Sequence, residues 1–311
     1  MLAMIYTLTL NPSLDRHITV KKLVKDDKIP AETVRFDAGG KGINVSRVIK
    51  ELGGRTKAFG IVGGYQGQIF KELLCREGID HELCESSGST RINLKIINLA
   101  DRSHIQINAP GPRLNAGEVK RLLALVEQII PRPSFWVLAG SIPPGVSDDT
   151  YKRLIQLFQK RGERCVLDTD GKSFKKGLEA RPFLIKPNEF ELERLLGRRC
   201  RTDRQLLATG RELTHKAEVV AITLGNKGAL VVTKDDAWRL KGIPVKVQSH
   251  TGAGDAFLGG FLTALDKGDD LPTTARWAVA VATVSVMNKG TARCKHADVK
   301  QMIKRVTIKK C

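Results

Sequence analysis

The sequence predicts an α/β protein with a mostly parallel central sheet and with antiparallel strands inserted beside it. Short apolar segments alternate with amphipathic ones along the chain, which is the pattern of βα units in a parallel sheet. Two stretches, 16–38 and 90–111, interrupt this pattern with strand-type alternation on both sides of a turn. We interpret them as two hairpins that lie outside the central sheet.

The expected elements follow one another along the chain. The strands expected in the central sheet are 5–10, 56–64, 135–140, 164–170, 183–188, 219–225 and 229–234. The expected helices are 43–53, 68–78, 148–161, 189–196, 203–216 and the apolar segment after residue 254. Because no internal repeat or low-complexity linker divides the chain, we expect a single domain over residues 1–311, with the two hairpins inserted in it.

The composition is that of a globular chain with ample material for a core. Of its 311 residues 41% are hydrophobic, and the longest apolar stretch, 277–287, is far shorter than the roughly 18 residues that cross a bilayer. The amino-terminal segment lacks the features of a secretory signal, so we expect a cytoplasmic protein without membrane contact. The six cysteines form no CxxC pair, and we expect free thiols. A formal net charge of +19 favours anionic partners.

The most informative motif is SHTGAGDAFLGGFLTAL, at residues 249–265. Its small residues, Thr251 to Gly254, form a turn into an apolar helix, where backbone N–H groups can converge on a phosphate-type anion. Asp255 follows in the first turn of that helix. It either caps the helix or takes a proton from a substrate hydroxyl while the amides stabilise a phosphoryl group. The segment lacks the GxxxxGK[ST] spacing of a Walker loop.

A second glycine-rich turn, FDAGGKGINVSRVIKELGG, spans residues 36–54. Gly39, Gly40 and Gly42 allow a ligand to approach the backbone closely, and the following helix presents an apolar face to the sheet. Alone, this turn is equally well explained as a structural junction between a loop and a helix. Its combination with the downstream motif favours a ligand site.

These motifs resemble those of the ribokinase/PfkB carbohydrate kinase family, and within it those of the phosphosugar kinases. The matching segments occur in the family's order and span nearly the whole chain: 7–15, 38–48, 90–96, 138–149, 184–192, 222–230 and 251–261. The resemblance implies a ribokinase-like three-layer sandwich with a small β-sheet lid. It also implies transfer of the γ-phosphoryl group of ATP to a hydroxyl of a sugar phosphate, and a homodimer formed through the lid.

The resemblance assigns catalytic roles by position in this sequence. Asp255 would be the catalytic base, and the amides of Gly252, Ala253 and Gly254 would form the anion hole. The residues implied for the sugar-phosphate side are Asp15, Lys28, Gly39, Gly40, Asn44, Arg91 and Ser141.

Two of these sugar-side residues, Asp15 and Lys28, have an alternative interpretation. Asp15 would bind sugar hydroxyls, or else cap the end of the first strand. Arg91 would face the phosphate that the sugar already carries, for which its planar fork is suited. Lys28 would reach the same phosphate, or else is a solvated surface charge.

The resemblance also implies a nucleotide side, formed by Lys186, Asn188, Glu191, Thr223, Gly225, Gly228 and Asn288. Glu191 would order water around Mg²⁺ rather than bind it, because Mg²⁺ keeps several waters and bridges nucleotide phosphates. We therefore expect Mg²⁺ to arrive with ATP and to have no direct protein ligand. In relatives the loop before the GAGD turn often supplies carbonyls to K⁺. His250 stands where they usually carry threonine, which leaves activation by K⁺ open.

The sequence favours fructose 6-phosphate as the acceptor. Segments 5–15, 108–115 and 288–298 look like the minor 6-phosphofructokinases, whereas 38–48 and 90–96 also look like 1-phosphofructokinases. Fructose 1-phosphate and tagatose 6-phosphate therefore stay open as alternatives. Two hypotheses of other classes are a sugar-phosphate sensor without catalysis and a nucleic-acid-binding protein. The first is disfavoured by the intact GAGD turn, and the second by the low aromatic content of 5%.

Overall fold

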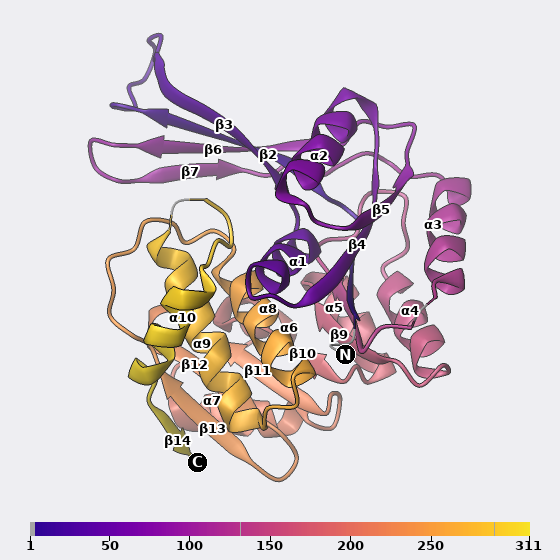
Figure 1. Ribbon diagram of the computed structural model, residues 1–311, viewed down its shortest axis with the longest axis vertical. Coiled ribbons are helices and arrows are strands. Elements are labelled where there is room, and N and C mark those ends of the chain that lie inside the picture. The colour runs from indigo at the N-terminus through magenta and orange to yellow at the C-terminus, as the bar shows by residue number, and fades with distance from the viewer. Residues whose placement is uncertain (1–3, 131, 289) are drawn as a thin grey trace.

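The computed structural model describes residues 4–130, 132–288 and 290–311, and its larger sheet runs through the middle of the molecule (Figure 1). The strands of this sheet lie in the order β14-β13-β12-β11-β10-β9-β8-β1-β4-β5. Along this order, the neighbouring strands from β11 to β5 pair in parallel, and those from β14 to β11 pair antiparallel. Their bounds are β1 Met4–Thr9, β4 Arg55–Val62, β5 His81–Glu85, β8 Phe135–Ala139, β9 Arg164–Asp168, β10 Leu184–Ile185, β11 Val219–Thr223, β12 Gly228–Val232, β13 Ala237–Lys241 and β14 Ile308–Lys310.

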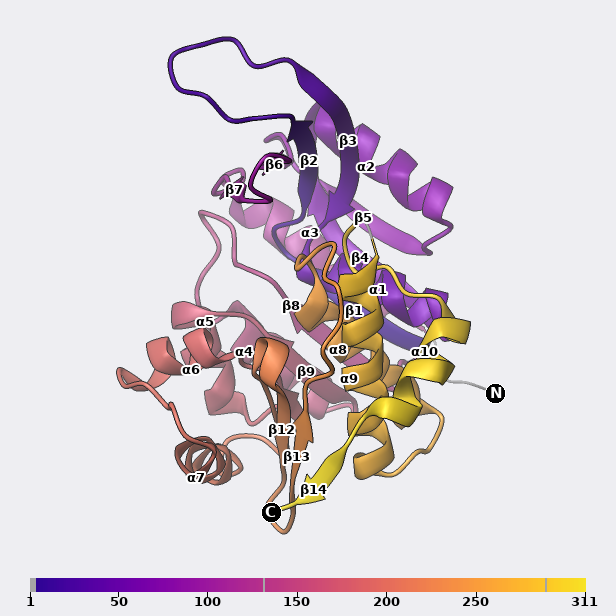
Figure 2. The ribbon, with the colours of Figure 1, turned by 90° about the vertical axis from the view of Figure 1, so that its left-hand side faces the viewer.

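Helices cover both faces of this sheet and make three layers (Figure 2). On one face lie α1 Lys41–Glu51, α2 Gly64–Glu77, α8 Ala253–Asp266, α9 Leu271–Met287 and α10 His296–Met302. On the other lie α3 Ala116–Gln128, α4 Thr150–Gln159, α5 Gly171–Gly177, α6 Glu189–Leu196 and α7 Asp203–Leu213. Successive residues of a strand point to opposite faces of the sheet, and each face has its own hydrophobic core. In β8, Phe135 and Val137 belong to one core, and Trp136 and Leu138 belong to the other.

The smaller sheet stands apart at one end of the molecule (Figure 1). It has the strand order β3-β2-β6-β7, with bounds β2 Ser13–Val20, β3 Ala31–Gly39, β6 Arg91–Asn98 and β7 His104–Ile107. The pairs β2/β3 and β6/β7 are antiparallel hairpins at the two expected places, and β2 and β6 join them in parallel. The predicted α/β class with a separate small sheet is therefore confirmed.

Two strands of the central sheet end earlier than the sequence-based expectations, for clear physical reasons. The strand expected at 183–188 is reduced to Leu184–Ile185, because Pro187 lacks an N–H for the ladder and Asn188 already caps α6. The strand at 219–225 ends at Thr223, where the chain turns into a short 3₁₀ helix, Gly225–Lys227.

Two expectations from composition can be compared with the structure. The six cysteines are free thiols. Within the described ranges no helix is both long and apolar enough to span a bilayer.

Candidate active site

The start of α8 lies beside the carboxyl end of the parallel sheet, and the N–H of Ala253 in its first turn makes a long hydrogen bond of 3.5 Å to the carbonyl oxygen of His250. Gly252 caps the helix with a φ of 79°, a left-handed conformation that favours glycine, and a Cβ there would lie 2.9 Å from the backbone nitrogen of Ala292. No side chain in the described part of the chain caps this helix. Helix-start N–H groups without a capping side chain form an anion-binding position.

Asp255 lies in this first turn and does not act as a cap. Its side chain is only 7% exposed, and its Oδ2 accepts a hydrogen bond of 2.7 Å from Nδ2 of Asn44 on α1. Burial, followed by the charge of Asp168, raises the pKa of Asp255 to about 6. A carboxylate with such a pKa is suited to accept a proton near neutral pH.

Two lysines converge on Asp168, at the carboxyl end of β9. Lys41 Nζ lies 2.8 Å from Asp168 Oδ1 and 3.0 Å from Glu191 Oε1, and Lys186 Nζ lies 3.2 Å from Asp168 Oδ2. Burial alone would raise the pKa of Asp168, but the ammonium groups of Lys186 and Lys41 outweigh it and lower the pKa. A Cβ on Gly254 would lie 3.2 Å from Lys186 Nζ, so this ammonium stands beside the start of α8.

Lys41 and Asp168 were not among the site residues predicted from the sequence. Both had a readable signal, since Lys41 lies inside the GGKG turn and Asp168 ends an apolar strand whose neighbours carry other site residues. The carboxyl ends of parallel strands meet at one edge of the sheet, where ligands bind in such folds.

The expected nucleotide-side residues form neighbouring turns with clear structural roles. Asn188 and Glu191 make a capping box at the start of α6, with backbone bonds of 2.9 Å in both directions. The backbone of Asn188 also pairs with that of Thr223, at the end of β11, in an isolated parallel β-bridge. Gly225 begins the adjoining 3₁₀ turn and Gly228 follows it, with φ values of 58° and 101°.

Asn288 lies apart from those turns, at the end of α9. Its Nδ2 donates to the carbonyl oxygen of Val284 at 2.9 Å, which closes the helix. The chain then returns to the GAGD turn, where the N–H of Ala292 donates to Thr251 O at 3.4 Å. Residue 289 lies outside the described residues.

One face of the small sheet is polar and carries the expected sugar-side residues Asp15 and Arg91. Asp15 lies inside β2, so the alternative that it caps the end of β1 is wrong. It accepts bonds from Ser13 Oγ at 2.7 Å and from Asn93 Nδ2 at 3.0 Å. Burial raises the pKa of Asp15 against these hydrogen bonds, which lower it. Asn93 was missed, although it lies two residues from Arg91 and therefore on the same face of the strand.

Arg91 is held by backbone carbonyls. Its Nη1 and Nη2 each donate at 2.8 Å, to the carbonyl oxygens of Ala109 and Asn11. Its Nε is buried and has no hydrogen-bond partner among the described residues. Nearby, Lys95 on β6 contacts the hydroxyl of Thr251 and so links the small sheet to the GAGD turn.

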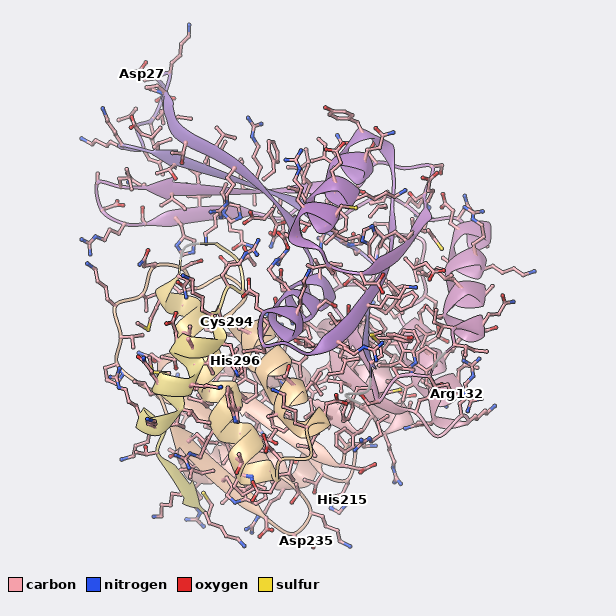
Figure 3. All side chains as sticks on the ribbon, in the orientation of Figure 1. Asp27, Arg132, His215, Asp235, Cys294 and His296 are labelled. Atoms are coloured by element: carbon pink, nitrogen blue, oxygen red, sulfur yellow. The ribbon has the colours of Figure 1, made fainter. Side chains whose placement is uncertain are left out.

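Some of the remaining sugar-side residues lie close to Asp15 and the start of α1, and one lies far from them. Gly39 packs against Asp15, because a Cβ there would lie 2.3 Å from its Oδ2, and Gly40 begins α1 with a φ of 123°. Ser141 accepts a bond of 3.1 Å from Asn11 Nδ2. Lys28 is exposed in the connection between β2 and β3, and Figure 3 shows its neighbour Asp27 at the outer tip of this hairpin. The structure therefore does not bring Lys28 to the start of α8.

Comparison with known proteins identifies the family of this chain. The model of the pfkB family carbohydrate kinases matches residues 8–298. The chain belongs to the pfkB family of carbohydrate kinases. It is 34% identical to 1-phosphofructokinase from Borreliella burgdorferi, over 98% of each chain. It is 33% identical to ATP-dependent 6-phosphofructokinase isozyme 2 from Escherichia coli, over 96% of this chain and 97% of the relative.

The fold of this pfkB kinase also matches a solved relative. Phosphofructokinase-2 from Escherichia coli, in complex with potassium, has a TM-score of 0.92 and 32% identity, with coverage of 97% of this chain and 99% of that chain. The family resemblance read from the sequence is thus confirmed.

The chemistry of the residues near Lys186 suits a magnesium nucleotide. Over residues 4–130, 132–288 and 290–311, no three His, Cys, Asp or Glu side chains cluster as a metal cage. Asp168 and Glu191 nevertheless offer neighbouring carboxylates, both bound to Lys41, and oxygen donors are those that Mg²⁺ prefers. A Mg²⁺ ion held chiefly by nucleotide phosphates fits these residues.

Proposed function

We propose that this pfkB sugar-phosphate kinase transfers the γ-phosphoryl group of ATP to fructose 6-phosphate and forms fructose 1,6-bisphosphate. The observation that carries the proposal is the buried Asp255 carboxylate, bound by Asn44 at the uncapped start of α8. A buried carboxylate and the N–H groups of a helix start thereby lie side by side, and within the described part of the chain no side chain caps this helix. These are the groups that phosphoryl transfer to a hydroxyl requires.

In this mechanism Asp255 accepts the proton of the attacking hydroxyl. The amides of Gly252, Ala253 and Gly254 stabilise the negative charge of the transferring phosphoryl group, because helix-start N–H groups attract anions. Lys186, which is 3% exposed and stands beside Gly254, adds a positive charge there. Closure of the small sheet excludes water, so that hydrolysis of ATP does not compete with transfer.

On the sugar side, Asp15 binds hydroxyl groups and Arg91 binds the phosphate that the substrate already carries. Support for Arg91 comes from its buried Nε, for which the described residues offer no hydrogen-bond acceptor, since a guanidinium N–H without a partner costs free energy unless a ligand accepts from it. Gly39, Gly40, Asn44 and Ser141 line the same side. Lys28 is a sugar-side residue only if the tip of its hairpin moves or belongs to a partner subunit's site.

On the nucleotide side, the turns that carry Lys186, Asn188, Glu191, Thr223, Gly225, Gly228 and Asn288 border ATP. When bound with ATP, Mg²⁺ neutralises phosphate charge, with Glu191 ordering its water ligands. The potassium complex of the relative from Escherichia coli supports a test of K⁺ activation, with His250 at the loop in question.

The choice of fructose 6-phosphate rests on sequence segments rather than on overall similarity. The relatives named 1-phosphofructokinase and 6-phosphofructokinase are 34% and 33% identical to the chain, which does not separate them. Segments 5–15, 108–115 and 288–298 favour the 6-phosphate. A 1-phosphofructokinase activity is the second candidate, and phosphorylation of tagatose 6-phosphate is the third.

We also propose a cytoplasmic homodimer formed through the small sheet. The face of this sheet opposite Asp15 is apolar, and it leaves Val34, Ile92, Ile105 and Ile107 between 39% and 56% exposed. Apolar side chains gathered on one sheet face mark an interaction surface.

The test is the release of ADP by the purified protein with Mg-ATP and each of the three sugar phosphates, compared by kcat/KM. The highest kcat/KM with fructose 6-phosphate supports the proposal. A higher value with fructose 1-phosphate or tagatose 6-phosphate keeps the chemistry and rejects the substrate. Retained binding of all three without turnover would favour the sensor hypothesis.

A further inference from the structure

Arg47 on α1 is a buried charged side chain that the mechanism above does not use. It is 2% exposed and makes three hydrogen bonds of 2.7 Å. Its Nη1 donates to Asn44 Oδ1, its Nη2 to the carbonyl oxygen of Ala38, and its Nε to Glu77 Oε2. One guanidinium thus joins three elements, β3, α1 and α2, beneath the expected sugar site.

The bond to Asn44 has a consequence for the catalytic base. An asparagine amide has an oxygen at one end and an NH₂ group at the other, and a guanidinium can only donate. Arg47 therefore requires the oxygen of Asn44 on its own side, which turns the NH₂ group towards Asp255 Oδ2. In the flipped orientation two oxygens would face each other at Asp255 and two donors would face each other at Arg47.

We propose that Arg47 is a positioning residue, which fixes the amide of Asn44 so that it donates to the carboxylate of Asp255. The bond to Ala38 serves the same end, because it holds the strand residue before Gly39 and so fixes the turn into α1. This inference rests on the proposed role of Asp255 as the base.

A purely structural role is the alternative, and the surrounding network allows the two to be separated. Glu77 also accepts from Arg293 Nη2 at 2.6 Å, so loss of Arg47 leaves it with a cationic partner. The charged groups that act on Asp255 are Lys41 from α1, Asp168 from β9 and Lys186 from the segment after β10. Among the described residues the hydrogen bonds of Arg47 go to Glu77, Asn44 and Ala38 and none goes to Asp255, so its influence on Asp255 must pass through Asn44 or through its charge.

A double-mutant cycle tests the inference with Arg47→Met, Asn44→Ala and the double variant. Arg47→Met is expected to lower kcat roughly ten- to a hundredfold, since misplacement of a reacting group has effects of this size. Loss of the donated bond also moves the acid limb of kcat/KM upward by about one pH unit. In the Asn44→Ala background Arg47→Met changes kcat less than about twofold, because the amide through which Arg47 acts on Asp255 is already missing.

Two outcomes of the cycle would overturn the inference. One is wild-type kcat with an unmoved acid limb in folded Arg47→Met, which would make Arg47 structural. The other is a further large loss in the Asn44→Ala background, which would mean that Arg47 acts by its charge or by another path.

Two further variants keep the test valid if Arg47→Met does not fold. Arg47→Lys keeps the charge but cannot hold Asn44 and Ala38 together, and we expect about fivefold lower kcat from the loosened geometry. Wild-type kcat in this variant would count against the inference. Glu77→Gln is the matched control, because it removes the negative charge that faces the same guanidinium and leaves the bond to Asn44. It should lower the free energy of unfolding while kcat stays near that of the wild type.

Failure of the proposed function would look different. If Asp255 is not the base, Asp255→Asn retains turnover. If only the inference about Arg47 fails, Asp255→Asn is inactive while the cycle gives one of the two overturning outcomes above.

Discussion

At the scale of single residues, Asp255 shows how burial creates a base. Its neighbours Lys41 and Lys186 favour the charged carboxylate, but burial and the like charge of Asp168 outweigh them and raise its pKa to about 6. The unprotonated form is needed to accept a proton. We therefore expect kcat/KM to fall as the pH drops through about 6, measured with saturating Mg-ATP, and this limb to be absent from Asp255→Asn. A limb near pH 4 in the wild type would contradict the assigned environment.

The same burial predicts a cost in stability. A carboxyl with a pKa of about 6 in the folded state and 3.8 as its ordinary value is ionised more readily in the unfolded chain, so the fold loses stability as the pH rises from about 4 to 6. Asp255→Asn removes the ionisation and can still accept from Asn44. Above pH 6 this variant should unfold with a free energy up to about 3 kcal/mol larger than that of the wild type, and at pH 3 the two should converge. Urea denaturation at the two pH values measures this difference, and equal stabilities at pH 8 would refute it.

The residue scale also shows what the sequence could and could not predict. Asp255 and Asn44 belong to motifs whose local spacing carries their meaning, and the structure places them in contact. Arg47 lies in the same motif as Asn44, but one of its three hydrogen-bond partners, Glu77, lies outside that motif. The bond to Glu77 depends on how α2 packs on α1, and the contact of Lys41 with Asp168 spans 127 residues. Neither can be read from the local sequence.

At the scale of elements, apolar periodicity predicted the central strands and most of the helices. It could not predict that β2 and β6 pair in parallel, because that pairing joins two hairpins far apart in the chain. Strands β5, β13 and β14 were not predicted. β5 and β14 are short and partly exposed at the sheet edges, so their apolar signal is weak. β10 was overestimated because the apolar run continues into a proline and a helix cap.

Arg91 belongs to this scale because it ties the second hairpin to the chain between β1 and β2. Arg91→Ala should raise the KM for the sugar phosphate at least tenfold if the guanidinium binds the phosphate, with a smaller change in kcat. Steady-state kinetics give both constants. The control is Asn93→Ala, which removes a neighbouring bond to Asp15 without removing a positive charge. An unchanged KM in folded Arg91→Ala would restrict Arg91 to the structural bonds with Ala109 and Asn11.

At the scale of the whole molecule, the small sheet has two different faces. Its polar face carries Asp15 and Arg91, and its opposite face leaves apolar side chains exposed, with Ile107 at 56%. Ile107→Glu should shift a dimer towards monomer in sedimentation velocity at micromolar concentration, because a charge on a buried apolar face is costly. Gln106→Glu, on the other face of β7, is the matched control and should leave the dimer intact. A monomeric wild-type protein would contradict the proposed interface.

The central claim is that Asp255 removes the proton from the sugar-phosphate hydroxyl, and one variant tests it most directly. Turnover of Asp255→Asn is measured as ADP release with fructose 6-phosphate and Mg-ATP, and binding of the sugar phosphate is measured by calorimetry. The account predicts retained binding and a kcat at least roughly 100-fold below that of the wild type, the usual size of a general-base effect. A kcat close to the wild-type value in a folded variant that binds the sugar phosphate would contradict it.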